Sequence, residues 1–255
     1  MREGQLQKGA MTDLTKRWPL GLDSHRWPVF CVAVLLGIVV LAQLDVWASR
    51  GAISWPENWR APFFFVTDYG LSDWVLIPTL VLLPISLLAR SMLTRLHRLV
   101  ATEVALLSAF IFLGVGAPGL IANLLKRLIG RGRPDEFETV GAFSFQNIVN
   151  DWNFQSFPSG HTTTAIALAF VIGFLWPRLY PYFLAIGVVV GISRVPVGMH
   201  YPTDVLGGLV VGMLGAYLVR NLFARRRWLF TTRPDGRIVP RGLPAIRRAF
   251  QRARA

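Results

Sequence analysis

Long apolar runs separated by polar connections constrain this chain more than any other feature of its sequence. The first run, residues 29–48, has about the 20 residues that a helix needs to cross a bilayer. Hydrophobic residues make up 53% of the 255 positions and charged residues only 16%, which is unusual for a soluble protein and normal for a protein with several membrane spans. The sequence therefore predicts an all-α integral membrane protein.

Six apolar runs predict a bundle of six transmembrane helices. They cover residues 29–48, 74–88, 104–125, 162–176, 181–193 and 205–223. The fourth and fifth runs are short for a bilayer, which is tolerable where helices are packed inside a bundle or thin the bilayer locally. The chain then divides into a loosely ordered N-terminal tail over residues 1–27, a six-helix domain over 28–223 and a basic tail over 224–255.

The net charge of +13 is concentrated at the C-terminal end, where eleven arginines from Arg220 to Arg254 are set against the single Asp235. No basic platform interleaved with aromatic residues occurs in a soluble segment, so we expect no nucleic-acid partner. An anionic lipid surface is the better partner for this tail. A basic amphipathic helix on that surface and a disordered basic tail both fit the sequence. The helix would have an apolar face made of Ile246, Ala249, Phe250 and Ala253.

The distribution of charge predicts the orientation in the membrane. The 89–98 connection carries basic residues and no acid, whereas the aromatic-rich loop 49–73, which suits the membrane–water interface, has more acids than bases. By the positive-inside rule, both termini and the 89–98 connection are cytoplasmic in a bacterial-type inner membrane. Six crossings then place the end of the third helix, the start of the fourth, the end of the fifth and the start of the sixth on the outer face.

The connection between the last two runs carries polar residues suited to catalysis. If Pro202 lies in the first turn of the next helix, where its missing N–H costs nothing, Asp204 falls in that turn and can reach back to His200. A histidine held by a carboxylate can act as a nucleophile or base, and Arg194 adds a planar cation suited to phosphate. An interfacial loop whose polar residues merely face water is the alternative.

Two further clusters lie at the predicted outer face. Lys126-Arg127-Leu128-Ile129-Gly130-Arg131-Gly132-Arg133-Pro134 closes the third run, and Phe157-Pro158-Ser159-Gly160-His161 opens the fourth. Written as K-x6-RP, PSGH and SR-x5-H-x3-D, the three clusters resemble the signature motifs of the type 2 phosphatidic acid phosphatase superfamily. The match runs from Lys126 to Asp204 in the right order and with intact spacing. That superfamily includes membrane lipid phosphatases, soluble acid phosphatases and vanadium haloperoxidases.

The assembled motifs predict a phosphate site. Lys126, Arg133 and Arg194 are three fixed cations around one point, which suits a phosphate monoester or a diphosphate. Gly160 lets the backbone approach closely, and free N–H groups at the helix start after Ser159 add donors. The resemblance implies that these five residues bind phosphate. Arg127 and Arg131 are interpreted as ordinary charges at the end of a membrane helix.

The two histidines take complementary roles. His200 has the carboxylate partner Asp204, so it is the predicted nucleophile and forms a phosphohistidine that water later cleaves. His161 is then the general acid that protonates the leaving oxygen. The resemblance implies the same roles and a metal-independent reaction without a cofactor. Two histidines and an acid could instead bind zinc, but three cations would repel the metal, and the only cysteine, Cys31, lies in an apolar run.

These expectations together describe a lipid phosphate phosphatase on the outer face of the membrane. Candidate substrates suggested by similar enzymes are an isoprenyl diphosphate, phosphatidylglycerol phosphate, phosphatidate and lipid A. One alternative is a phosphotransferase on the same scaffold, in which a lipid or sugar hydroxyl replaces water. The other is a non-catalytic membrane protein that binds phospholipids, for which an orienting acid and two histidines are not needed. The sequence predicts no oligomeric state.

Overall fold

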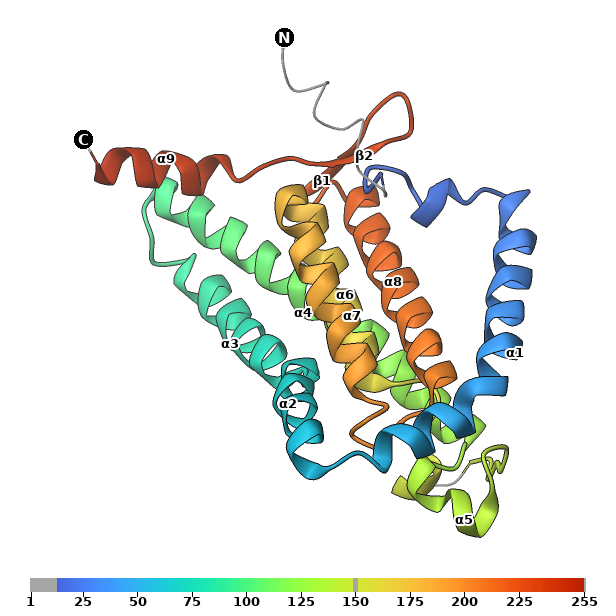
Figure 1. Ribbon diagram of the computed structural model, residues 1–255. Helices are drawn as coiled ribbons and strands as arrows, with labels where there is room; N and C mark the ends of the chain where they lie inside the picture. The colour runs from blue at the N-terminus through green and yellow to red at the C-terminus, as the bar shows by residue number, and fades with distance from the viewer. Residues whose placement is uncertain (1–12, 149–150, 255) are drawn as a thin grey trace.

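The structure, a computed structural model, describes residues 13–148 and 151–254 and consists mainly of helices (Figure 1). The α-helices are α1 (Arg26–Ile53), α2 (Glu57–Thr67), α3 (Asp73–Ala89), α4 (Arg95–Ile129), α5 (Phe137–Val140), α6 (Gly160–Leu175), α7 (Tyr180–Ser193), α8 (Pro202–Arg225) and α9 (Pro244–Ala253). Five 3₁₀ turns lie in the described part, at Pro19–Gly21, Asp68–Gly70, Pro134–Glu136, Trp152–Phe154 and Pro177–Leu179. Two short strands, β1 (Phe230–Thr232) and β2 (Ile238–Pro240), form an antiparallel hairpin.

Helices occupy all six predicted membrane positions, as α1, α3, α4, α6, α7 and α8. Within the described residues, four helical stretches are long and apolar enough to cross a membrane: Arg26–Ile53, Glu57–Ala89, Arg95–Ile129 and Pro202–Arg225. The stretches Gly160–Leu175 and Pro177–Ser193 are apolar but shorter. The protein is therefore a multi-pass membrane protein with four candidate spans, and the predicted count of six depends on α6 and α7.

Two expectations about regular structure need correction. The predicted loop 49–73 is largely helical, because α1 continues to Ile53 and α2 follows after Pro56. Its exposed Trp59 and Phe65 lie on α2, which keeps aromatic rings at the surface while the backbone bonds to itself. The prediction of an all-α chain holds for the membrane part, whereas the β1–β2 hairpin adds a small sheet after α8.

Helix α6 is the centre of the bundle. It is buried over most of its length and packs on α4, α7 and α8. Close packing depends on small residues: a Cβ at Gly208 would lie 2.5 Å from the Ser159 carbonyl oxygen, and one at Gly212 would lie 2.5 Å from the Thr163 carbonyl oxygen. Glycine residues of α8 therefore allow close contact with the backbone of α6.

The segments flanking the bundle are folded against it at one end. Phe230 of β1 inserts beside Phe110, with ring centroids 4.8 Å apart. The buried Arg220 of α8 donates to the carbonyl oxygens of Leu14 and Lys16 at 2.5 and 2.7 Å. The expected loose N-terminal tail is thus held in place from residue 13 onward, and its first twelve residues lie outside the described part. Of the two alternatives for the C-terminal tail, the structure has the helix.

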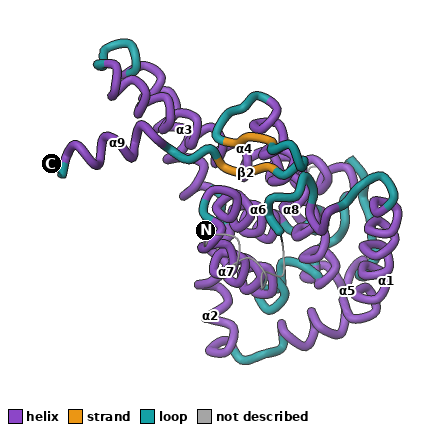
Figure 2. Tube along the Cα trace, turned by 90° about the horizontal axis from the view of Figure 1, so that it is seen from above, coloured by secondary structure: helices purple, strands orange, loops and turns teal. Residues whose placement is uncertain are grey.

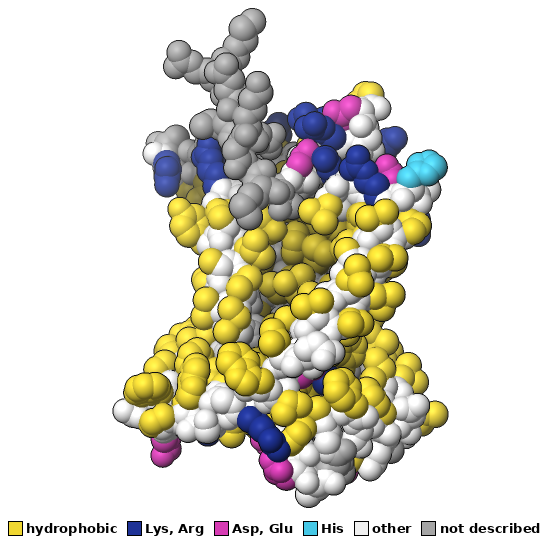
Figure 3. Space-filling model, turned by 45° about the vertical axis from the view of Figure 1, so that its right-hand side comes forward, with side chains coloured by type: hydrophobic (Ala, Val, Ile, Leu, Met, Phe, Trp, Pro, Cys, Tyr) yellow, Lys and Arg dark blue, Asp and Glu magenta, His cyan; other side chains and the backbone are white. Residues whose placement is uncertain are grey.

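The two ends of the molecule differ in character. Helix α9 and the hairpin lie across one end of the bundle, and α5 lies at the opposite end (Figures 1 and 2). The face in Figure 3 shows a broad apolar band with Lys and Arg side chains gathered beyond its upper edge. Helices α4, α6, α7 and α8 all have one terminus at the α5 end, and this is where the three motifs lie.

Candidate active site

The three motifs meet at the α5 end of the bundle. The backbone N–H of Ser159, in the second motif, donates to the carbonyl oxygen of Asp204, in the third, over 2.9 Å. Arg133 of the first motif donates through Nη1 to the carbonyl oxygen of Met199 over 3.0 Å. Residues separated by up to 78 positions in the sequence are therefore parts of one site.

The end of α4 places the first motif. Lys126 lies in the last turn, and Gly130 ends the helix in the left-handed conformation with φ +63°. A Cβ at Gly130 would lie 1.7 Å from the carbonyl oxygen of Gln146, so only glycine fits this turn. The chain then leads Arg131 and Arg133 back under the bundle, where both are buried.

Three cations of the site are bonded to neutral oxygen atoms. Lys126 Nζ donates to two backbone carbonyls of the loop before α6, at 2.7 and 3.2 Å. Arg133 donates to the Met199 carbonyl, and Arg194 Nη1 donates to the Thr67 hydroxyl. In the described part of the chain, none of the three forms an ion pair with a carboxylate. Their positive charge is therefore available to an anion.

Both arginines keep their charge at neutral pH. Burial lowers the pKa of Arg133 to about 10, and burial together with the neighbouring charge of Arg133 lowers the pKa of Arg194 to about 10. Each value lies well above 7. The guanidinium groups can thus offer planar, bidentate donors to phosphate oxygens.

Helix α6 begins directly at the second motif. Ser159 is its N-cap and accepts hydrogen bonds from the Thr162 N–H at 3.4 Å and the Thr162 hydroxyl at 2.9 Å. The serine hydroxyl therefore orients the helix start. The first N–H groups of a helix have no acceptor within the helix, so those of Gly160 and His161 are donors at a positive dipole end. A Cβ at Gly160 would lie 3.7 Å from Lys126 Cε, which places this backbone beside the lysine.

The third motif has the predicted helix start. Helix α8 begins at Pro202, Asp204 lies in its first turn, and His200 immediately precedes it, as expected. Asp204 Oδ2 reaches back to accept from the Tyr201 N–H at 2.8 Å and lies 3.6 Å from His200 Nδ1. That last distance is longer than a hydrogen bond. The carboxylate thus lies beside the imidazole without a hydrogen bond to it.

His200 is almost fully buried among positive charges. Burial is the main influence on it, followed by the charges of Lys126, Arg133 and Arg194, and together they hold the pKa of the imidazole well below its ordinary value of 6.5. His200 is therefore neutral at pH 7, the state in which one ring nitrogen has a lone pair for attack.

His161 lies near the same group of cations as His200. It lies in the first turn of α6, is half-buried, and is within electrostatic reach of Arg194, Lys126 and Arg133. The two histidines therefore share one set of positive neighbours, but His161 is more accessible than His200. A phosphate bound among the cations would therefore have two imidazoles nearby, one available for attack and one for protonation of the leaving group.

Arg131 was wrongly interpreted as an ordinary charge at a helix end. Its Nη1 donates to Asp204 Oδ1 at 2.7 Å, and its Nη2 donates to Asp45 Oδ2 at 2.8 Å. All three side chains are at most 5% exposed. Removing one partner of a buried ion pair typically costs about 3–5 kcal/mol, because it leaves an uncompensated charge. Arg131 and Asp45 are thus integral to the site.

Asp45 was missed because it lies far from the motifs in sequence. A carboxylate inside the first apolar run is costly in a bilayer unless it has a partner. That cost could have identified Asp45 as a candidate for a buried ion pair. Ser156 was also missed: its hydroxyl donates to Asp204 Oδ2 over 2.5 Å. A serine near a motif carries no signal of its own.

Comparison with known proteins supports the resemblance seen in the motifs. Residues 106–228 match the PAP2 superfamily. The chain is 36% identical to the lipid A 1-phosphatase of Rhizobium johnstonii over 244 residues, which cover 94% of this chain and 97% of that protein. It is 38% identical to phosphatidylglycerophosphatase B of Bacillus subtilis over 117 residues, which cover 42% of this chain and 53% of that one.

A crystal structure of a transmembrane PAP2-type phosphatidylglycerolphosphate phosphatase from Bacillus subtilis is 27% identical, with a TM-score of 0.49, covering 76% of this chain and 96% of that one. The matched residues 106–228 contain every position of the three motifs. The relative from Rhizobium johnstonii is similar over nearly its entire length. The chain is therefore a membrane-embedded phosphatase, and it belongs to the PAP2 superfamily.

Proposed function

We propose that this phosphatase removes a phosphate group from a membrane lipid, with the 1-phosphate of lipid A as its first candidate substrate. The main support for this reaction is that Lys126, Arg133 and Arg194 lie together beside two histidines. In the described part of the chain, none of the three cations is paired with a carboxylate. Such a group of cations suits a multiply charged phosphate. The near full-length similarity to lipid A 1-phosphatases from two Rhizobium species supports the choice of lipid.

In the proposed reaction, His200 is the nucleophile. Asp204 faces its Nδ1, so the attacking atom is Nε2. As the Nε2–P bond forms, the bond from phosphorus to the lipid oxygen breaks, and His161 gives its proton to that oxygen. Water then attacks the phosphohistidine, His161 takes a proton from the water, and inorganic phosphate leaves.

The cations act on the charge that develops during transfer. Lys126, Arg133 and Arg194, with the first N–H groups of α6, surround the position of the transferring oxygens and are held by the fold before substrate arrives. Preorganised donors of this kind need no rearrangement when charge builds up. A phosphate dianion also offsets the cations around His161, which favours its protonated, proton-donating state.

An exposed apolar rim beside the site suits a lipid substrate. The loops next to the first and second motifs expose Phe143, Phe145, Ile148 and Trp152 by more than half of their surface. Arg133 lies over the Trp152 ring at 4.1 Å, which connects the rim to the phosphate-binding cations. We propose that acyl chains lie along this rim while the phosphate enters between the cations.

The orientation proposed for the molecule places this site on the periplasmic face of a bacterial-type inner membrane. In this arrangement α6 and α7 also cross the membrane: α6 is packed inside the bundle, where short helices are tolerated, and α7 packs along α6. The basic flanking segments at the other end are cytoplasmic by the positive-inside rule. In this orientation, residues 1–27 and 224–255 are the two cytoplasmic regions.

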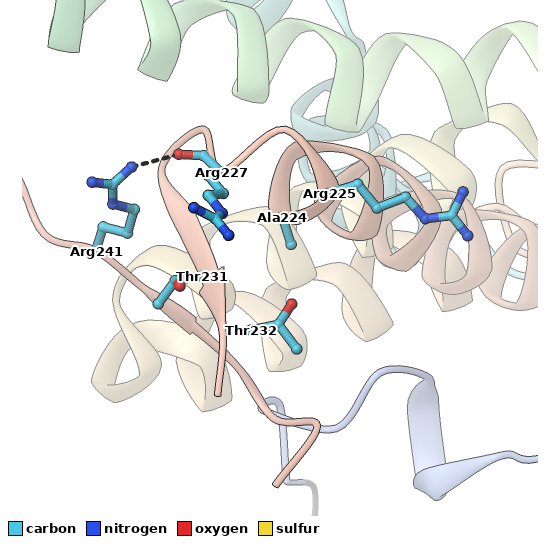
Figure 4. Close-up of a pocket in the computed structure, with 6 residues that line it drawn as sticks. All are labelled: Ala224, Arg225, Arg227, Thr231, Thr232 and Arg241. Atoms are coloured by element: carbon cyan, nitrogen blue, oxygen red, sulfur yellow. Dashed lines mark hydrogen bonds between the residues drawn. The ribbon is translucent and has the colours of Figure 1, made fainter. Parts of the chain in front are cut away.

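The cytoplasmic end is proposed to contact anionic lipid. The carboxylate of Glu103 accepts from the Ala245 and Ile246 N–H groups at 3.0 and 2.9 Å, which fixes α9 across the end of α4. A hollow of about 490 Å³ at the same end is lined without any acid, by Ala224, Arg225, Arg227, Thr231, Thr232 and Arg241 (Figure 4). Basic side chains at this level attract anionic headgroups.

Phosphate release by the purified protein in detergent with EDTA tests the proposed function. The substrates are lipid A, phosphatidylglycerol phosphate, phosphatidate and an isoprenyl diphosphate, each with the wild type, His200→Ala and the control His97→Ala. His97 is exposed and lies at the far end of α4. We expect EDTA-resistant release from lipid A that His200→Ala abolishes and His97→Ala leaves intact.

Three outcomes would contradict the proposal. Activity that needs added metal or survives His200→Ala would refute the mechanism. Preference for another lipid would refute the substrate. Loss of the lipid phosphate without free inorganic phosphate would indicate a phosphotransferase.

A further inference from the structure

A buried charge network connects α1 to the third motif. Asp45 is fully buried and accepts three hydrogen bonds: from Arg131 Nη2 at 2.8 Å, from the Thr203 N–H at 3.0 Å and from the Thr203 hydroxyl at 2.6 Å. The Thr203 hydroxyl accepts in turn from Arg131 Nη1 at 2.6 Å. Arg131 Nη1 also reaches Asp204 Oδ1. Asp45 is therefore one residue removed from the acid that faces His200.

The packing of α1 concentrates on this contact. Among the described residues of α1, only Asp45, Ser49 and Ala52 are buried, and their spacing places them on one helix face. Most of the helix is exposed apolar surface that suits lipid. An acid in such a helix is costly unless it is paired, and here the pairing partner is the guanidinium that also holds Asp204.

The charge balance explains why two carboxylates share one guanidinium. Arg131 alone would neutralise Asp204, and a neutralised carboxylate holds an imidazolium poorly. With Asp45 included, the buried group Asp45–Arg131–Asp204 has a net charge of −1. That negative charge lies beside His200, because Asp204 Oδ2 is 3.6 Å from His200 Nδ1. In a low-dielectric site, one unit of charge at this distance has a large effect.

We infer that Asp45 is a positioning residue for catalysis: through Arg131 and Thr203 it fixes the Asp204 carboxylate and preserves its negative charge toward His200. The inference rests on the proposed phosphohistidine mechanism. Asp45 itself does not touch the reacting atoms. A purely structural role would predict instead that loss of Asp45 lowers the yield of folded protein while the folded fraction turns over normally.

The test compares Asp45→Asn with the wild type in steady-state phosphate release, normalised to the monodisperse fraction. The amide retains the shape and an acceptor oxygen but removes the charge. We expect kcat to fall about 10–100-fold, as for outer partners that orient a functional histidine. KM should stay unchanged, because the cations that bind phosphate are untouched. The control Asp73→Asn removes an exposed acid from the first turn of α3 and should leave both constants unchanged.

If Asp45→Asn does not fold, Thr203→Val serves as the second variant, because it removes the bridging hydroxyl and retains both charges. It should lower kcat several-fold with KM unchanged. Unchanged kcat in folded Asp45→Asn, or in Thr203→Val where Asp45→Asn does not fold, would overturn the inference alone. An inactive wild type, or activity that survives His200→Ala, would instead refute the proposed function.

Discussion

His200 has nearby charges of both signs, and together they influence its protonation state and its tautomer. Lys126, Arg133 and Arg194 lie around it, and Asp204 faces it at 3.6 Å. The cations and burial favour the neutral ring, which is the nucleophilic state. The carboxylate favours the tautomer with its proton on Nδ1. Phosphate bound among the cations would offset their positive charge, so the influence of the Asp204 carboxylate on the His200 ring would become stronger.

The pH dependence of turnover follows from the low pKa of His200. A depressed pKa means that the neutral ring persists as pH falls through 6.5 and is lost only below that value. Because kcat/KM reports groups of the free enzyme, we expect its acidic limb to lie below pH 6.5. The second ionisation of the substrate phosphate must be measured by phosphorus NMR in the same micelles and divided out. An acidic limb at or above pH 6.5 after that correction would contradict this assignment.

Local sequence rules predicted the residues that act within one turn of the chain. Pro202 begins α8, and Asp204 reaches back across that turn, because proline and acids favour the first turn of a helix. Asp45 and Arg131 were not predictable in this way. They are 86 positions apart, and their contact arises only from the packing of α1 beside α8.

At the scale of helices, the apolar runs predicted where the membrane helices lie along the chain, but they predicted less well where each helix begins and ends. The run 104–125 lies within α4, which extends from Arg95 to Ile129 because charged residues continue the helix beyond the apolar stretch. Helix α2 was missed because its aromatic residues suggested an interfacial loop. Hydropathy measures the preference of a segment for lipid, and it does not detect a helix that lies at the boundary between lipid and water.

Helix α8 positions the third motif through its contact with α6, which gives a prediction at this scale. Gly212→Ala adds a methyl group 2.5 Å from the Thr163 carbonyl oxygen, so the helices must separate. We expect a destabilisation of about 1–3 kcal/mol, measured as a lower thermal midpoint in detergent, together with reduced activity.

The control is Gly119→Ala in α4, where an added methyl group has no neighbour within 4 Å among the described residues. It should retain or raise the midpoint, since alanine favours a helix over glycine by about 1 kcal/mol. Equal midpoints for the two variants would show that close contact between α6 and α8 is unimportant.

At the scale of the whole molecule, the two ends have separate tasks. The α5 end gathers the buried ionic site, and the other end gathers exposed arginines, α9 and the hairpin (Figures 1 and 3). Glu103 of α4 caps α9 by accepting from two N–H groups at the start of that helix. The sequence showed the charge asymmetry, but it contained no signal for this pairing across 142 positions.

The proposed lipid contact of α9 can be measured with a fluorescent probe. Phe250 is 65% exposed, and Phe250→Cys in a Cys31→Ser background provides a single labelling site. In nanodiscs, we expect emission to shift to the blue when phosphatidylglycerol replaces part of a zwitterionic lipid, and high salt to reduce the shift. The same label at Gln251, on another helix face, should respond less. Identical emission in both lipids would refute the contact.

Trapping of the reaction intermediate without acid is the sharpest test of His200 as the nucleophile. The wild type is mixed with lipid A carrying a radiolabelled 1-phosphate, quenched in alkali within one turnover and mapped by mass spectrometry. We expect one phosphoryl group on His200 of the wild type. It should be absent from His200→Ala and should form more slowly in Asp45→Asn. A phosphoryl group on any other residue, or rapid turnover without a covalent intermediate, would contradict it.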